Sequence, residues 1–168
     1  MHEAVEIGHE AITKLLLDYG ANLEACGWLK QTALHIAILG RNEALTKLLL
    51  DRGANLEACD PENRTALHIA VVTRNEAITK LLLDHGANLE ACDWNNRTAL
   101  HIAVENRNEA ITKLLLDRGA NTEARSVYGL TILRVASHCC NDAITKLLLD
   151  HGADRSVIDS YRQIASSI

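Results

Sequence analysis

The residues of this chain that could do chemistry are histidines and cysteines, which ligate soft metal ions and take part in redox reactions. Most of them recur at a spacing of 33 residues, as His2, His35, His68 and His101, and as Cys26, Cys59 and Cys92. A separate group is consecutive: His138, Cys139 and Cys140. Acidic residues are spread as periodic charges, and neither a glycine-rich phosphate loop nor a nucleophile with its base stands out. Catalysis therefore finds no support.

The regular spacing argues against a metal site and against disulfides. Equivalent positions in stacked helical repeats lie roughly 10 Å apart, whereas Zn–N bonds are about 2 Å long, so one ion cannot bind histidines from successive repeats. A disulfide needs Cα atoms closer than about 7 Å. We expect the three periodic cysteines to stay free as small, semi-buried hydrophobic residues, which favours a reducing compartment. The consecutive group lacks a second ligand cluster, so no metal and no cofactor is expected.

The histidines belong to a repeat that covers nearly the whole chain. Thr-Ala-Leu-His occurs at 32–35, 65–68 and 98–101, with a degenerate copy at 131–134, and Lys-Leu-Leu-Leu-Asp occurs at 14–18, 47–51, 80–84, 113–117 and 146–150. A fixed period of this length is typical of an architecture in which each unit packs only on its neighbours. The 168 residues are therefore expected to form one continuous domain.

Each repeat has the signals of two short helices. In the unit 60–92, Thr65 and Asn75 are residue types that cap helix N-termini, which predicts helices over about 65–72 and 75–84. The second helix is apolar on two sides and needs neighbours on both. One such unit cannot bury its own faces, so the units must stack.

The pattern Thr-x-Leu-His-x-Ala, then a helix with Leu-Leu, then Gly-Ala, at a period of 33, resembles the ankyrin repeat. The resemblance implies an all-α solenoid of stacked helix–turn–helix–loop units with short hairpin-like loops. It implies a concave face, formed by the hairpin tips and the first helices, and a convex back formed by the second helices. It also implies a non-catalytic scaffold for protein–protein interaction. The repeated histidine is then expected to bond the threonine and the adjoining loop backbone.

The chain departs from the family at two glycine positions. The glycine between the two helices remains only as Gly8 and is replaced elsewhere by Arg41, Arg74, Arg107 and Cys140. The hairpin glycine remains only as Gly129 and is replaced by Lys30, Asn63 and Asn96. The turn between the helices is expected either to differ or to be mildly strained. Asparagine tolerates positive φ better than most residues, so Lys30 is the least comfortable substitution.

Aligning the repeats divides the chain into numbered units. We expect a single domain over 1–168, with a partial repeat at 1–26, full repeats at 27–59, 60–92, 93–125 and 126–158, and the start of a truncated repeat at 159–168. Arg134 breaks the histidine series, so the unit 126–158 should be tied less firmly. Neither end carries an obvious polar cap, which indicates either a fragment of a longer array or imperfectly capped ends.

Composition predicts the residue types of the core and limits the class of partner and the cellular location. The core must consist of leucine, isoleucine, alanine and valine, because 48 % of residues are hydrophobic but phenylalanine is absent and aromatics make up 3 %. A net charge of −5 argues against nucleic acid as the partner, since phosphate binding needs clustered lysine and arginine. No apolar run reaches the roughly 18 residues of a membrane span, and no signal peptide is evident. The expected location is intracellular, cytoplasmic or nuclear.

Recognition is expected where the repeats differ from one another. These positions lie at the hairpin tips, where exposed aromatic side chains are typical interface anchors, and at the ends of the first helices. The candidate partner-binding residues are Trp28, Leu29, Leu39, Glu62, Val72, Thr73, Trp94, Asn95, Glu105, Asn106, Tyr128, His138 and Cys139. The ends of the second helices also vary, and we interpret Tyr19, Arg52, His85, Arg118 and His151 as solvent-exposed variation.

An alternative function is structural. Near-identical repeats and uncapped ends also fit a spacer, a self-associating element that joins end to end, or an engineered consensus-like scaffold, none of which has a dedicated ligand. In that case a tryptophan at a hairpin tip would pack only on the neighbouring hairpin.

Overall fold

The computed structural model describes residues 1–27 and 29–156. In this part of the chain, ten helices follow one another in pairs: α1 (His2–Glu6), α2 (Glu10–Asp18), α3 (Ala33–Leu39), α4 (Glu43–Asp51), α5 (Ala66–Val72), α6 (Glu76–Asp84), α7 (Ala99–Glu105), α8 (Glu109–Asp117), α9 (Ile132–His138) and α10 (Asp142–Asp150). Two expectations lie outside the described residues: the truncated repeat at 159–168 and the partner-binding role of Trp28.

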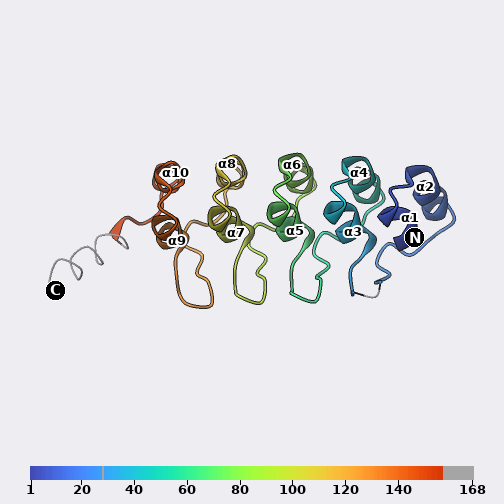
Figure 1. Ribbon diagram of the computed structural model, residues 1–168, viewed down its shortest axis with the longest axis horizontal. Helices are drawn as coiled ribbons and strands as arrows, with labels where there is room; N and C mark the ends of the chain where they lie inside the picture. The colour runs from blue at the N-terminus through green and yellow to red at the C-terminus, as the bar shows by residue number, and fades with distance from the viewer. Residues whose placement is uncertain (28, 157–168) are drawn as a thin grey trace.

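The helix pairs stack side by side in chain order (Figure 1). The first helices of the pairs form one layer, the second helices form another, and the long loops extend from the first layer away from the second. The described residues form one isolated antiparallel bridge, between Arg125 and Thr131, and contain no extended β-strand. The predicted all-α solenoid of stacked helix–turn–helix–loop units is therefore confirmed.

Side-chain caps set the helix boundaries close to the prediction. Thr65 is the N-cap of α5, and Asn75 is the N-cap of α6, where its Oδ1 atom accepts a hydrogen bond of 3.0 Å from the backbone N–H of Ile78. Both helices thus begin one residue later than predicted, because the capping residue has an extended backbone. The same asparagine cap opens α4, α8 and α10, whereas His9 at the start of α2 makes no side-chain cap.

The core lies between the layers and between neighbouring pairs. It is built from the residue types that composition predicted: leucine, isoleucine, valine and alanine. Each interior first helix buries two alanines four residues apart, such as Ala66 and Ala70, which allow neighbouring helices to approach closely. The second helices of the pairs, which we call the outer helices, contribute fully buried residues such as Ile78 and Leu82. Each pair therefore depends on the next one for burial.

Glutamates in the loops also join neighbouring repeats. The carboxylate of Glu57 accepts a hydrogen bond of 2.9 Å from the backbone N–H of Asn88, which lies 31 residues further on. The same contact recurs along the stack, from Asn55 to Glu24, from Asn121 to Glu90 and from Asp154 to Glu123. These contacts satisfy backbone donors at the same point of each repeat.

The two replaced glycine positions keep the left-handed backbone conformation. Between the helices, φ is +83° at Gly8 and +54°, +55°, +54° and +50° at Arg41, Arg74, Arg107 and Cys140. At the hairpin position, φ is +52°, +58°, +54° and +69° at Lys30, Asn63, Asn96 and Gly129. The turn is thus retained, and the second expectation, mild strain, is the correct one, because L-residues rarely adopt this region.

Among the described helices, none combines the length and the apolar character needed to cross a membrane.

Replacing Lys30 by glycine should raise the free energy of unfolding by roughly 1 kcal/mol, because the left-handed conformation costs an L-residue about that much. Urea denaturation measures the change. Gly53→Ala is the matched control: φ there is +82° and no atom lies within 4 Å of an added Cβ, so this variant should be destabilised for conformational reasons alone. A loss of stability in Lys30→Gly would contradict the assigned strain.

Candidate functional site

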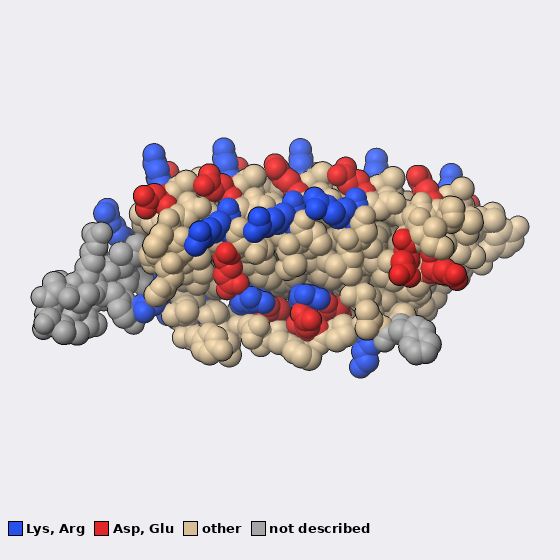
Figure 2. Space-filling view, viewed as in Figure 1, with Lys and Arg blue, Asp and Glu red and all other residues tan. Residues whose placement is uncertain are grey.

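Candidate residues that lie one repeat apart form rows along the stack. We call Leu39, Val72, Glu105 and His138, each at the C-terminal end of a first helix, the helix-end row. We call Leu29, Glu62, Asn95 and Tyr128, each in a hairpin loop, the tip row. Thr73, Asn106 and Cys139 follow the helix-end row by one residue, and Trp94 precedes Asn95 in its loop. Together these residues form what we call the variable surface. Figure 2 shows one face of the molecule, on which charged residues run in bands along the stack.

Large apolar side chains are exposed in both rows and at Trp94 beside the tip row. Trp94 is 71 % exposed and Tyr128 is 83 % exposed, while Leu39 and Val72 are each 43 % exposed. At the N-terminal end, Leu29 and Leu39 line one cavity of about 410 Å³ with His2, Glu6, Gly27, Gln31, Ile36 and Gly40. The structure thus brings these two candidates together, whereas Tyr128 lies three repeats away.

The hairpin tips are fixed to one another through their backbones. Trp94 donates its backbone N–H to the carbonyl of Glu62 at 3.3 Å, and Val127 donates to Asn95 at 2.8 Å. Asn63 also donates its side-chain amide to the carbonyl of Cys92 at 2.7 Å. The backbone of Trp94 is therefore held while its indole faces solvent, which argues against a tryptophan that only packs on its neighbouring hairpin.

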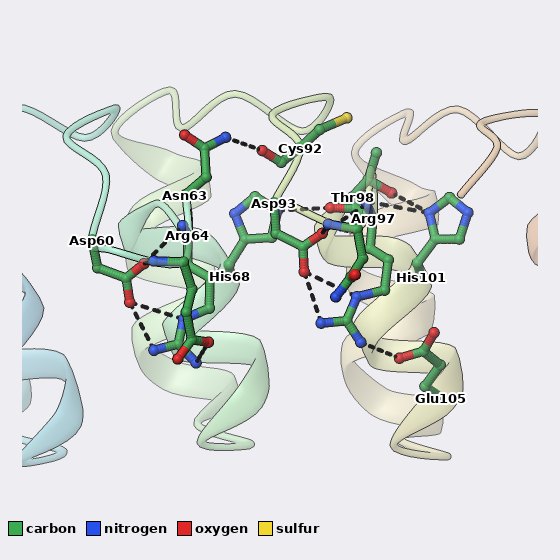
Figure 3. Close-up of polar contacts among 12 residues, drawn as sticks. Asp60, Asn63, Arg64, His68, Cys92, Asp93, Arg97, Thr98, His101 and Glu105 are labelled. Atoms are coloured by element: carbon green, nitrogen blue, oxygen red, sulfur yellow. Dashed lines mark hydrogen bonds and ion pairs between the residues drawn. The ribbon is translucent and has the colours of Figure 1, made fainter. Parts of the chain in front are cut away.

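A buried carboxylate organises each of the two central hairpins (Figure 3). One oxygen of Asp93 accepts from Nε and Nη2 of Arg97 at 2.9 and 2.7 Å, and the other accepts from the backbone N–H groups of Asn95 and Arg97 at 2.8 and 2.9 Å. Asp60 and Arg64 repeat this geometry one repeat earlier. Sequence reasoning missed these pairs, although an Asp and an Arg four residues apart recur at the same place in both units.

Hydrogen bonding decides the protonation of these aspartates. Burial would raise the pKa of Asp93, but hydrogen bonds from the Arg97 side chain and backbone outweigh it and lower the pKa below its usual value. The pKa of Asp60 is lowered by the same balance, with Arg64 as the partner. Both carboxylates are therefore charged at neutral pH.

The same arginines also bind two of the candidate acidic residues. Arg97 reaches Glu105 at 2.8 Å and so connects the hairpin to the end of α7 (Figure 3). Arg64 reaches Glu62 at 2.9 Å. The structure thus places Glu62 and Glu105 on the variable surface, but with their charges already paired within the chain.

The repeated histidine bonds as the resemblance implied. His68 Nδ1 accepts from the backbone N–H of Thr65 at 3.2 Å and lies 2.9 Å from its hydroxyl, while Nε2 lies 3.1 Å from the carbonyl of Arg97 in the next repeat. The Nδ1 acceptor fixes the tautomer with hydrogen on Nε2. His2 makes the same link to the carbonyl of Gln31. His35 and His101 keep the threonine contact, but their Nε2 atoms have no hydrogen-bond partner among the described residues.

Burial favours the neutral form of these histidines. Burial lowers the pKa of His35, His68 and His101, and neighbouring carbonyls and carboxylates offset it only in part. In the fourth full unit, Arg134 stands where the other units have histidine. At the start of α9 in this unit, the buried hydroxyl of Thr131 has no hydrogen-bond partner in the described part of the chain. The threonine link of the other units is therefore missing there.

The cysteines are free and lie at the surface. Cys26 and Cys59 are exposed and Cys92 is half-buried, so the expectation of semi-buried residues is wrong for the first two. Partial burial, followed by the charges of neighbouring acidic residues, raises the pKa of Cys59 and Cys92. Over residues 1–27 and 29–156, no group of three histidine, cysteine or acidic side chains is arranged to hold a metal ion.

The ends of the second helices lie at the surface, but their residues also make contacts that the sequence analysis did not predict. Four of these residues form ion pairs with the last aspartate of the preceding outer helix: Arg52 with Asp18 at 3.0 Å, His85 with Asp51 at 3.6 Å, Arg118 with Asp84 at 2.8 Å and His151 with Asp117 at 3.3 Å. The histidine pairs are charged only when the ring is protonated. Exposed pairs of this kind typically contribute up to about 1 kcal/mol each.

Comparison with known proteins agrees with this arrangement. A family model described as ankyrin repeats (3 copies) matches residues 1–93 and 88–159. No curated protein matches the sequence significantly. The two matched segments together run from residue 1 to residue 159, and they include every helix of the described structure.

Stability should fall as the pH is lowered below about 6.5, the usual histidine pKa. The lowered folded-state pKa of His35, His68 and His101 means that the unfolded chain binds protons first, so stability is fully present above that pH and is lost as the pH falls through the folded pKa. Urea midpoints at pH 7.5 and 5.5 measure the loss. The double variant His85→Gln, His151→Gln should still show the loss, because it leaves the three buried histidines in place. A wild-type midpoint that does not fall between these two pH values would contradict the assignment.

Replacing Asp93 by asparagine should lower the free energy of unfolding by about 2–3 kcal/mol, because the change removes charge-assisted hydrogen bonds from a buried site. Thermal or urea denaturation measures the loss. Glu62→Gln removes an exposed ion pair and should change stability by less than about 1 kcal/mol. Equal effects of the two substitutions would show that the buried pair does not organise the hairpin.

Proposed function

This chain belongs to the ankyrin-repeat family, and we propose that it is a non-catalytic scaffold that binds a protein partner through its variable surface, the concave face expected for the family. Ankyrin repeats are generally protein–protein interaction modules, and the family typically acts as a scaffold rather than as an enzyme. The proposal adds to this the face that binds and the residues that contact the partner.

One observation carries the proposal. Outside the first repeat, every exposed large hydrophobic residue of the described structure lies in a hairpin loop or at the end of a first helix: Leu29, Leu39, Val72, Trp94, Val127 and Tyr128. Exposed apolar side chains that gather on one face, beside polar residues, mark interaction sites. We expect Trp94 and Tyr128 to be the anchors, since aromatic side chains supply much of the binding energy at protein interfaces.

The remaining candidates have supporting parts in this proposal. Asn95, Thr73, Asn106, His138 and Cys139 offer polar groups at the edges of the apolar patches. Glu62 and Glu105 are held by Arg64 and Arg97, so we expect them to shape the surface more than to attract a basic partner. Free thiols on the surface fit a reducing compartment, which supports a cytoplasmic or nuclear location.

The variants Trp94→Ala and Tyr128→Ala should each weaken partner binding at least ten-fold, because loss of a central aromatic anchor typically costs 2 kcal/mol or more. Affinity capture from the source cell, followed by titration of each captured protein, measures the effect. Tyr19→Ala is the matched control, since Tyr19 is 85 % exposed but lies at the end of outer helix α2. Unchanged binding by folded Trp94→Ala and Tyr128→Ala proteins would show that the partner does not bind the variable surface.

A second candidate, end-to-end self-association, is favoured by the first repeat. Ile12 is 48 % exposed in α2, whereas Leu45 and Ile78, its equivalents in α4 and α6, are completely buried by the stack. Leu15 in the same helix is also exposed. This apolar end has the composition of an inter-repeat contact, so a second copy of the chain could pack against it.

Sedimentation velocity at several protein concentrations tests this second candidate. Self-association should raise the sedimentation coefficient as the concentration increases, and the double variant Ile12→Glu, Leu15→Glu should abolish the rise. A strict monomer over the whole range would exclude the candidate, while leaving the proposal for the variable surface unaffected.

A further inference from the structure

We propose that Arg41, Arg74 and Arg107 form a binding row for an extended acidic segment of the protein partner. This inference rests on the proposed function and narrows its partner to one with regularly spaced carboxylates. The segment would lie along the stack beside the helix-end row. Each arginine would bind one carboxylate.

The three arginines occupy equivalent places in successive repeats. Each follows the end of its first helix, α3, α5 or α7, by two residues and precedes an outer helix, so the three mark the turns between the layers. All three are exposed. Figure 2 shows a band of basic side chains along the middle of the face, between the acidic residues of the outer helices and the surface of the first helices. The arginine row therefore borders the variable surface.

The backbone at these positions is strained because the turn requires it: in each repeat the backbone N–H groups of the arginine and of the next asparagine bond carbonyls at the end of the first helix, as Arg41 and Asn42 do with Ile38 and Ala37 at 2.9 Å. All three residues have φ near +54°, a region that favours glycine, and Gly8 occupies the same turn in the first repeat. An L-residue there costs about 1–2 kcal/mol. Arg74 donates one hydrogen bond of 3.1 Å to the carbonyl of Asn106. The side chains of Arg41 and Arg107 make no hydrogen bond or ion pair among the described residues. The turn explains the left-handed backbone but does not require an arginine side chain, since Gly8 makes the same turn. A residue type that costs stability where glycine fits points to a role for its side chain.

The charges around the row restrict carboxylate binding to direct contact with the arginines. Glu62 and Glu105 are paired with Arg64 and Arg97. Three further glutamates open the outer helices two residues after each arginine, and none forms an ion pair with the row: Glu43, Glu76 and Glu109. These glutamates weaken the long-range field of the arginine row. Binding must therefore come from direct contact, for which the guanidinium fork matches a carboxylate geometrically.

The repeat period sets the spacing of the ligand. Equivalent residues of neighbouring repeats lie roughly 10 Å apart, and an extended chain advances about 3.3 Å per residue. Three residues of an extended segment thus cover one repeat. A partner with an acidic residue at every third position would present one carboxylate to each arginine, whereas a helix, which rises 1.5 Å per residue, would need one at about every seventh position.

Synthetic peptides test this spacing without knowledge of the natural partner. The probe is a fluorescein-labelled peptide of serine and glutamine with three glutamates at every third position. One control has the same composition with the glutamates consecutive, and another has them at every seventh position. Fluorescence anisotropy at low ionic strength should give the first peptide a Kd at least five-fold lower than either control. Equal affinities, or tighter binding of the seventh-position peptide, would overturn the extended geometry.

Protein variants then locate the binding site. Arg41→Gly, Arg74→Gly, Arg107→Gly should weaken peptide binding at least ten-fold while urea denaturation shows equal or higher stability, because glycine relieves the strained turns. The matched control Lys47→Gln, Lys80→Gln, Lys113→Gln removes three exposed charges from the outer helices and should change the Kd less than two-fold. An equal loss of peptide affinity in both triple variants would show that binding depends only on net charge and would overturn the proposal.

Three further outcomes separate this inference from its alternatives. An oligothymidylate with three phosphates that binds the arginine row more tightly than the peptide would assign the row to nucleic acid and overturn the proposal. Loss of natural partners in Trp94→Ala, combined with no binding of any acidic peptide, would disprove the acidic segment and leave the proposed function intact. Peptide binding that depends on the arginine row, combined with partner binding unaffected by Trp94→Ala and Tyr128→Ala, would support the arginine row and contradict the proposed function at the variable surface.

Discussion

The stack depends on the apolar core that neighbouring repeats share, and its most complete polar connection runs from the threonine at the start of a first helix, through a buried histidine, to the loop of the next repeat. Thr65, His68 and the carbonyl of Arg97 make this connection in full. A neutral imidazole can accept at one nitrogen and donate at the other, so one side chain closes a helix start and joins two repeats. Because the repeats share one apolar core, a link that fixes their relative position also fixes the surface that they display.

Hydrogen bonds hold the backbone of the variable surface at the hairpin tips. The buried carboxylates of Asp60 and Asp93 hold the two central hairpins from inside, while backbone hydrogen bonds join the tip at Glu62 to Trp94 and the tip at Asn95 to Val127. Preorganised side chains lose less conformational freedom on binding. The backbone of Trp94 is therefore held in place by contacts that the two central hairpins share.

The charges of the variable surface are also decided by contacts within the chain. Arg64 is shared by Asp60 and Glu62, and Arg97 is shared by Asp93 and Glu105, so both glutamates already have a partner within the chain. In a protein with a net charge of −5, Arg41, Arg74 and Arg107 nevertheless form no ion pair among the described residues. Net charge alone would suggest a basic partner. Local pairing suggests the opposite, because short-range recognition depends on the charges that remain available and not on their sum.

Sequence alone determined the fold, because a strict period of 33 residues, helix caps such as Asn75 and the Thr-Ala-Leu-His motif are all local signals. It also located the strained turns, since glycine occupies them in some repeats and Arg41 or Lys30 in others. It missed the buried Asp93–Arg97 pair, the ion pairs between outer helices and the exposure of Cys59. These features depend on how far side chains reach within and between repeats, and periodicity places backbones without fixing such contacts. Only the tertiary structure, in which residues 31 to 34 positions apart become neighbours, decided which charges are paired and which side chains face solvent.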